Sequence, residues 1–327
     1  MKNKKLLSFI FATLLISSSF LAQSQIRMLS GFFKGSYYEM ANDIKIVAKD
    51  IVNVDTIFTV GANGQDSIAF SRSKSEFLHI LTSKGSLHNF KKLSREEKPQ
   101  VAFMQYDVLI EQQLKDIKKY KKRTDSIRVL IPLGFEEIHL IALKDSKIKK
   151  IKDLKKKKVA VGEAQQGTSV TAGLIKEKLG AEWIDVQVSF KDALFALLNH
   201  KIDAFFFVGS APVSKLNGLS PTYRKLKIIP IKDKSLEEIY TKTTIPANTY
   251  HWLDKDVETY AVRLLLVSDI SKESQADDKN LRKLLTDIQN NIGKLQEEGH
   301  PNWKKVDFNF SDIQWQVHDV AKKVFGL

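Results

Sequence analysis

The sequence predicts an α/β protein made of two lobes, and three observations support that fold class. Short apolar runs alternate along the chain with segments of helical periodicity, which is typical of sheets covered by helices. A length of 327 residues is sufficient for two domains that each bury a core. The content of 43% apolar and 28% charged residues is that of an ordinary globular protein.

The first 24 residues predict export. Three lysines among the first five residues precede an apolar run over residues 6–21, and Ala22 and Ser24 place small side chains where a signal peptidase cleaves. We therefore expect residues 1–24 to be a cleaved signal peptide and the mature protein to be periplasmic. A retained N-terminal anchor is the alternative, although the run is short for a membrane span.

Hydrophobic periodicity assigns the elements in order. Residues 26–29 form a short apolar run and predict a strand, and a glycine-punctuated loop leads from it to a helix over residues 37–50. The polar segment 61–75 predicts a loop or a short helix, and residues 257–266 carry conflicting strand and helix signals. Further strands are expected, from short apolar runs, at residues 54–60, 77–81, 101–104, 129–133, 138–143, 159–161, 204–208 and 228–231. Further helices are expected, from apolar residues at helical spacing, at residues 87–93, 170–179, 192–199 and over most of residues 273–327.

The order of the elements predicts how the chain divides into lobes. Residues 130–250 contain a self-contained alternation of strands and helices, whereas the segments on either side are each too small for a complete sheet domain. We therefore expect a discontinuous lobe I from residues 25–129 and 251–327, with lobe II from residues 130–250 inserted. Ligands of open α/β sheets bind beyond the carboxyl ends of the strands. The loops expected to face one another across such a cleft are residues 31–36, 105–107, 165–169 and 209–210.

The start of the helix at residues 170–179 has the composition of an anion-binding site. Gly167, Thr168 and Ser169 connect this helix with the preceding strand. Unpaired N–H groups and the positive end of the helix dipole converge at such a terminus, which suits a carboxylate. The alternative is that Thr168 or Ser169 only caps the helix.

Six ordered motifs resemble one family, the TAXI-type solute-binding proteins of tripartite ATP-independent periplasmic (TRAP) transporters. The motifs are GFFKGSYY at residues 31–38, GSLHN at 85–89, VAFMQYD at 101–107, VAVG and GTSVTA within 153–172, DAFFFV at 203–208 and IPANTY at 245–250. Two features depart from the family pattern. Asn248 stands where the family has glycine, and about 16 residues at 61–76 are additional.

The resemblance implies the type II periplasmic-binding-protein fold, with two α/β lobes, a ligand cleft between them and no cofactor. It also implies an exported receptor that captures a small organic acid or amino acid and delivers it to the membrane permease of a TRAP transporter. An exported ligand-binding sensor without a dedicated transporter is the alternative.

The expected ligand-binding residues belong to the matched loops of both lobes. They are Ser36, Tyr37, Ser86, Gln105, Asp107, Gly167, Thr168, Ser169 and Phe207. The segment 167–169 is expected to hold a carboxylate, Phe207 to wall the pocket, and the others to contact the ligand from lobe I. The alternative for Gln105 and Asp107 is a strand-end turn, and that for Tyr37 is helix packing. Lys34 is the one cation in these loops.

Composition and spacing argue against catalysis and metal binding. The chain has no cysteine, which excludes disulfides, thiolate metal sites and cysteine nucleophiles. The seven histidines show no close metal-ligand spacing, and no G-x-S-x-G nucleophile elbow is present. Glu136 and Glu137, which precede His139, are expected in an exposed loop. We expect no metal site and no enzyme activity, with a hydrolase as the less favoured alternative.

The basic charge predicts a solvated surface rather than a nucleic-acid site. The formal net charge is +14, and nine lysines lie within residues 144–158. Aromatic residues do not alternate with these lysines, and an exported protein seldom meets nucleic acid. We expect no nucleic-acid partner, and attraction of anionic ligands or membrane surfaces as a secondary effect.

Overall fold

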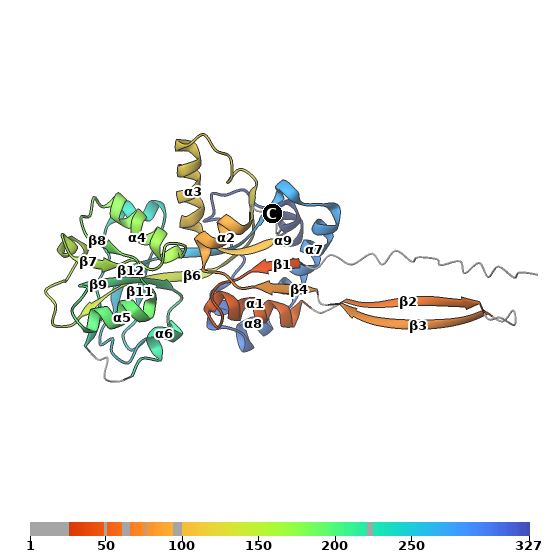
Figure 1. Cartoon of the computed structure of the whole chain (residues 1–327), viewed down its shortest axis with the longest axis horizontal. Coiled ribbons are helices and arrows are strands. Elements are labelled where there is room, and N and C mark those ends of the chain that lie inside the picture. Colours follow the sequence, from red (N-terminus) through yellow and green to blue (C-terminus); the bar gives the residue numbers. More distant parts are fainter. Residues whose placement is uncertain (1–25, 49–50, 61–65, 76, 94–99, 221–224) are drawn as a thin grey trace, which may run out of the picture.

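Two lobes share one continuous sheet in the computed structural model of this protein (Figure 1). The structure describes residues 26–327 apart from 49–50, 61–65, 76, 94–99 and 221–224. The predicted signal peptide at residues 1–24 lies outside the described residues. Within the described part of the chain, every helix is too short or too polar to cross a membrane.

Lobe I is organised around a parallel core of three strands. β1 (Ile26–Leu29) lies between β4 (Leu78–Leu81) and β5 (Val101–Gln105) and pairs with both in parallel. The sheet continues from β5 to β12 (Val257–Asp269), which is antiparallel, and then to β6 (Ile127–Leu143). The strand order within lobe I is therefore β4, β1, β5 and then β12, a strand that arrives from the other lobe.

Lobe II repeats this order. β7 (Lys158–Ala160) lies between β8 (Ile184–Val186) and β9 (Ala204–Gly209) in parallel, and β9 continues to the antiparallel β6. Two short strands complete the lobe, β10 (Leu226–Ile228) beside β6 and β11 (Thr241–Ile245) beside β12. The predicted fold class is confirmed: two α/β lobes of the type II periplasmic-binding-protein fold.

Two long strands connect the lobes. β6 has 17 residues, so the two separate strands expected at 129–133 and 138–143 are one continuous strand. Its first part pairs with β12 and its last part with β9. The ambiguous segment 257–266 forms most of β12, because both faces of the strand are covered and its apolar residues run without alternation.

Helices cover both faces of the shared sheet. Lobe I carries α1 (Ser36–Val47), α2 (Ser86–Leu93), α3 (Tyr106–Lys118), α7 (Gln275–Asn290), α8 (Ile292–Glu298), η5 (Pro301–Lys305) and α9 (Asp319–Phe325), with η4 (Ile270–Lys272) at the end of β12. Lobe II carries η1 (Ile151–Leu154), α4 (Gly167–Lys178), α5 (Phe190–Leu198), α6 (Ser214–Asn217) and η3 (Lys234–Glu238).

Each lobe has its own hydrophobic cores. In lobe I, Leu281, Leu284 and Ile288 of α7 pack with residues of β1, β5 and β6, as the helical spacing predicted. Burial of each such side chain stabilises the fold by about 1.5–3 kcal/mol.

Trp252 and Val257 pack with lobe II residues. The lobe boundaries stay a prediction, with lobe I at residues 25–129 and 251–327 and lobe II at residues 130–250. Because the two lobes share one sheet, the sheet itself does not divide the chain into two independent units.

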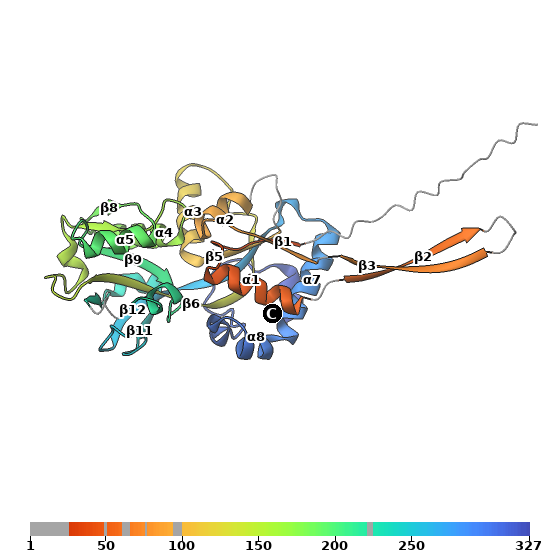
Figure 2. The ribbon, with the colours of Figure 1, turned by 60° about the horizontal axis from the view of Figure 1, so that its bottom comes forward.

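A separate hairpin projects from lobe I in both views of the ribbon (Figures 1 and 2). β2 (Ile51–Val60) pairs with β3 (Asp66–Ser75) in an antiparallel two-stranded sheet. The expectation of a loop or short helix at 61–75 is wrong for residues 66–75. Pairing with β2 satisfies the backbone of this polar segment, so the strand needs no apolar run of its own.

A candidate ligand pocket between the lobes

A cavity of about 600 Å³ lies between the lobes, at the carboxyl ends of their strands. Each of the four loops predicted to face a cleft contributes lining residues, among them Gly31, Gln105, Thr168 and Gly209. The volume is in the range of sites for small organic ligands. Strand order explains this placement, because parallel strands in both lobes end at the same cleft.

Seven of the nine expected ligand-binding residues line the cavity. They are Ser36, Tyr37, Ser86 and Gln105 from lobe I, and Gly167, Thr168 and Phe207 from lobe II. Asp107 and Ser169 are not among the lining residues. The Ser169 hydroxyl instead donates to the Gln166 carbonyl oxygen at 2.8 Å.

Asp107 joins the lobes behind the pocket. Its side chain is fully buried, and Oδ2 accepts hydrogen bonds from the hydroxyls of Thr171 at 2.6 Å and Tyr240 at 3.0 Å, both in lobe II. Asp107 is the second residue of α3, and its side chain bonds to Thr171 of α4. This direction explains why Asp107 does not line the cavity. Burial raises the pKa of Asp107 to about 6, although these two hydrogen bonds act to lower it.

The floor of the pocket is a network of hydrogen bonds around Glu136. The Tyr37 hydroxyl donates to Glu136 Oε2 at 2.8 Å, and Gln105 Nε2 donates to the same oxygen at 2.7 Å. Ser86 Oγ accepts from the Gln105 N–H at 3.0 Å and lies 3.3 Å from the Tyr37 hydroxyl. Two of the expected binding residues thus bond to one carboxylate, and Ser86 links these two residues to each other.

Glu136 is a site residue that the sequence analysis missed. The expected exposed loop at Glu136 and Glu137 is wrong, because both residues lie in β6 and only 3% of Glu136 is exposed. Burial, together with the nearby carboxylates of Asp107 and Glu137, raises the pKa of Glu136 to about 7. The signal was present in the sequence as two adjacent carboxylates between apolar runs that now form one strand.

The lobes meet closely where Gln105 contacts α4. A Cβ atom on Gly167 would lie 1.5 Å from Gln105 Oε1, so this position accommodates only glycine without moving the Gln105 amide. Gln105 is itself buried and held by Glu136. A backbone hydrogen bond from the His88 N–H to the Gln165 carbonyl, 3.0 Å long, adds a second link between the lobes.

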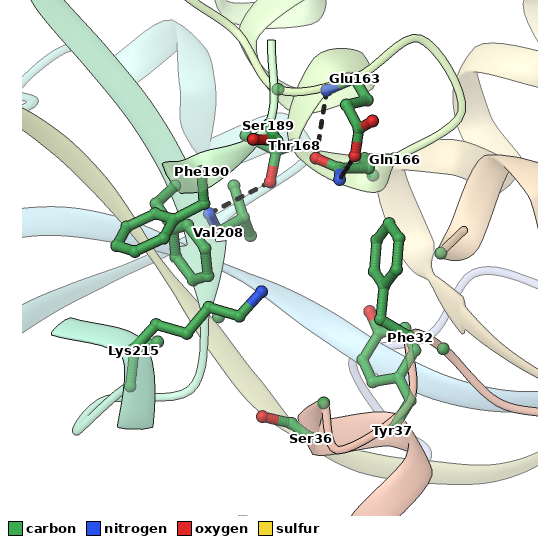
Figure 3. A pocket seen from close by; sticks show the side chains of 18 of the residues that line it. Phe32, Ser36, Tyr37, Glu163, Gln166, Thr168, Ser189, Phe190, Val208 and Lys215 are labelled. Carbon is green, nitrogen blue, oxygen red and sulfur yellow. Dashed lines mark hydrogen bonds between the residues drawn. The ribbon is translucent and has the colours of Figure 1, made fainter. Parts of the chain in front are cut away.

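The first turn of α4 presents its backbone to the cavity. The helix is preceded by Gln166, which makes no side-chain capping bond, so the capping role proposed for Thr168 or Ser169 is wrong. The helix begins at Gly167, two or three residues earlier than a cap at Thr168 or Ser169 requires. Thr168 Oγ1 accepts from the Val208 N–H at 3.3 Å and lies at the cavity wall (Figure 3). The first N–H groups of a helix lack intrahelical partners, so they are suited to an anion here.

The opposite wall combines aromatic rings with an ammonium group. Phe32 from lobe I and Phe190 from lobe II flank the cavity, and the Lys215 side chain extends into it from α6 (Figure 3). The ammonium nitrogen of Lys215 lies 5.8 Å from the centre of each of these rings. Lys34, the one cation in the matched loops, also lines the cavity, where its exposed side chain lies over the Phe33 ring. Lys215 was missed because it lies in a segment without a matched motif.

One cluster in the described part of the chain has the spacing of a metal site, Glu273, Asp278 and His318. His318 Nδ1 accepts a hydrogen bond from the Val320 N–H, so its Nε2 carries the proton that it donates to Glu273 at 2.7 Å. Both ring nitrogens are therefore engaged, and the cluster is explained as the cap of α9. His139 is similarly engaged by the Glu137 carbonyl and the Tyr250 hydroxyl, and burial lowers its pKa to about 4.

Three solved structures show modest similarity to this chain. A Xanthomonas citri protein bound to ATP aligns over 86% of this chain and 88% of its own, with 11% identity and a TM-score of 0.49. The substrate-binding protein of an amino acid ABC transporter aligns over 93% and 100%, with 13% identity and a TM-score of 0.43. The ligand-binding core of GluR0 from Nostoc punctiforme, in complex with L-glutamate, aligns over 83% and 96%, with 12% identity and a TM-score of 0.46. We assign no ligand or partner from these similarities.

A family model extends over most of the chain. The model of the NMT1-like family matches residues 34–306, a range that contains every residue described above as lining the pocket except those of the loop at 31–33. The match therefore includes both lobes and the strands that connect them. This chain belongs to the NMT1-like family.

Proposed function

We propose that this protein is an exported receptor that captures a small carboxylate-bearing solute, an organic acid or an amino acid, in the cavity between its lobes. The observation that carries the proposal is the convergence of Lys215 and the first turn of α4 on one cavity. A positive side chain and unpaired N–H groups both favour an anionic ligand group.

The construction of the cavity supports binding coupled to lobe closure. Lining residues come from both lobes, so a ligand makes its full set of contacts only when the lobes are together. Such a ligand shifts the population towards the closed arrangement. The contacts of Asp107 with Thr171 and of Gln105 with Gly167 hold the lobes in that arrangement.

The lining favours reversible binding over turnover. Its hydroxyl residues include Ser36, Ser86 and Thr168, and none of the lining residues that the structure describes is a histidine. A serine nucleophile requires an adjacent base, and the hydrogen-bond partners of Ser86 Oγ are the Gln105 N–H at 3.0 Å and the Tyr37 hydroxyl at 3.3 Å, neither of which is a general base. A hydrolase is therefore the weaker candidate.

The membrane partner belongs to the same proposal. The motif resemblance supports membership of the TAXI type, periplasmic location and delivery to the permease of a TRAP transporter. A sensor without a transporter uses the same cavity and differs only in the step after ligand binding. Loss of uptake of the identified solute in cells that lack this chain supports transport, whereas unchanged uptake favours the sensor.

Calorimetric titration with a panel of dicarboxylates, 2-oxoacids and amino acids tests the binding function. We expect at least one class to bind and to raise the melting temperature. The Thr168→Ala variant should bind about fivefold more weakly if the hydroxyl meets the ligand, which corresponds to about 1 kcal/mol. Failure of the whole panel, together with consumption of esters or peptides, would contradict the proposal.

A further inference from the structure

The carboxylate on the floor of the pocket has one oxygen without a protein partner. Both donors that reach Glu136 from described residues, the Tyr37 hydroxyl and Gln105 Nε2, bond to Oε2. No described residue donates to Oε1, and Glu136 is a lining residue of the cavity although only 3% of it is exposed. An ionised carboxylate accepts about four hydrogen bonds. The cavity therefore contains a carboxylate oxygen to which no described protein group donates.

The cavity also contains a cation without a carboxylate partner. Lys215 contacts the Phe32 and Phe190 rings, and none of the described carboxylates forms an ion pair with it. Its ammonium group points into the space between the rings (Figure 3). The same cavity thus offers a positive group from α6 of lobe II and a negative group on the connecting strand β6, with apolar rings beside them.

We propose that Glu136 selects a primary amine on the solute, so that the ligand is a zwitterionic amino acid with an apolar or aromatic side chain. Lys215 and the first turn of α4 receive its carboxylate, Glu136 Oε1 receives its ammonium group, and the rings of Phe32 and Phe190 receive its side chain. This inference rests on the proposed binding function and narrows it to one class of ligand.

The chemistry of the floor disfavours the other ligands in the carboxylate class. At pH 8, where Glu136 is ionised, a dicarboxylate would bring its second anionic group towards a like charge, which is unfavourable in a buried environment. A 2-oxoacid offers only acceptors, so at that pH it would leave Oε1 without a donor. An ammonium group supplies both the donor and the opposite charge that a buried carboxylate requires.

The titration of Glu136 supports this assignment and makes it measurable. The groups that face it are Tyr37 from α1, Gln105 from β5, Asp107 from α3 and Glu137 of its own strand, and none is a cation. The pKa of about 7 in the free protein means that Glu136 is largely protonated at pH 6. An amino acid must then displace that proton, so its affinity should fall about tenfold from pH 8 to pH 6.

The test compares ligands that differ only in the amine. We would titrate the full chain with L-phenylalanine and 3-phenylpropionate, and with L-leucine and 4-methylpentanoate, at pH 7.5. The amino acids should bind at least 100-fold more tightly than their deamino partners. In Glu136→Gln this ratio should fall below tenfold. Glu177→Gln, which removes an equal charge from the exposed face of α4, should keep the full ratio.

A second measurement needs no variant and guards against misfolding of Glu136→Gln. Titration of the native protein at pH 6 in buffers of different ionisation enthalpy should show release of about one proton per amino acid bound. The deamino acids should release none. Equal affinity for both members of each pair, or an unchanged ratio in Glu136→Gln, would overturn this inference and leave carboxylate binding intact. Failure of every carboxylate to bind would instead overturn the proposed function, and this inference with it.

Discussion

The two sides of the pocket are built on different principles. The lobe I side is a buried network in which Tyr37, Gln105 and Ser86 are positioned around Glu136 by strand ends and helix starts. The opposite side is more exposed and consists of the rings of Phe32 from lobe I and Phe190 from lobe II, with the long Lys215 side chain on a four-residue helix between them. The floor thus presents a fixed polarity, whereas the wall can adapt to the shape of a ligand. In our interpretation the floor decides the ligand's polar groups and the wall accommodates its apolar part.

The largest expected effect comes from separating the two sides. Gly167→Ala places a methyl group onto the Gln105 amide and should displace it from Glu136, or keep the lobes apart. We expect affinity for the solute to fall about 100-fold, which corresponds to loss of a charge-assisted hydrogen bond. In the presence of ligand, small-angle scattering should show a larger radius of gyration for Gly167→Ala than for the native protein.

Gly173→Ala is the matched control for that variant. This residue lies on the same helix, and a Cβ atom there would meet nothing within 4 Å. Alanine favours the helix, so stability should rise slightly and affinity should stay unchanged. Native affinity in Gly167→Ala would show that the close approach of the lobes is not needed for binding.

Removal of the cation should affect only the wall. Lys215→Met keeps the apolar stem beside Phe32 and Phe190 but removes the charge, so we expect about 20-fold weaker binding, as for one lost charged hydrogen bond. Lys34→Met, at the exposed rim over Phe33, should weaken binding by less than threefold. A larger effect of Lys34 than of Lys215 in the same titration would assign the anion-binding role to the loop at 31–36.

The contact behind the pocket should contribute to stability more than to affinity. Asp107→Ala leaves the Tyr240 hydroxyl without its acceptor and weakens the bonding of Thr171, so the free energy of unfolding should fall by about 2 kcal/mol. Asp107→Asn retains an acceptor oxygen and should lose less. Chemical denaturation at pH 8 distinguishes the two variants. Equal stability of Asp107→Ala and the native protein would show that the bonds of Asp107 to lobe II do not stabilise the fold.

The smallest expected effect is a change in the pH dependence of stability. The folded protein holds a proton on Glu136 up to about pH 7, whereas the unfolded chain releases it near the usual value of 4.5. Folded Glu136 therefore binds more protons between these values, and its contribution to stability falls as the pH rises from 4.5 to 7.

Glu136→Gln should remove this decline. Relative to the native protein, its melting temperature should increase by a few degrees at pH 8 and change little at pH 4, since about 1 kcal/mol corresponds to about 2–4 °C. Parallel melting curves for the variant and the native protein from pH 4 to pH 8 would contradict the raised pKa. The variant is expected to be more stable and yet to discriminate less between ligands.

Much of the site could be predicted from local patterns. Gln105, Gly167 and Phe207 line the pocket as expected, because each lies at the end of a strand or the start of a helix that periodicity identifies. Asn248, which replaces a family glycine, has a φ of 64° as its position required. Asp107 illustrates the limit. It was assigned to the right loop, but the direction of its side chain depends on how α3 packs against α4.

The sequence by itself determined the fold class and the loops that meet at the cleft, because hydrophobic periodicity and strand order act through near neighbours and general packing rules. It did not determine the hairpin strand β3, the continuity of β6 or the helix α3. Only the tertiary structure decided that Glu136 is buried, that Lys215 reaches the cavity and that Asp107 joins the lobes. Those properties depend on contacts between residues far apart in the chain, such as Glu136 with Tyr37, and burial of a charge has no local signature in the sequence.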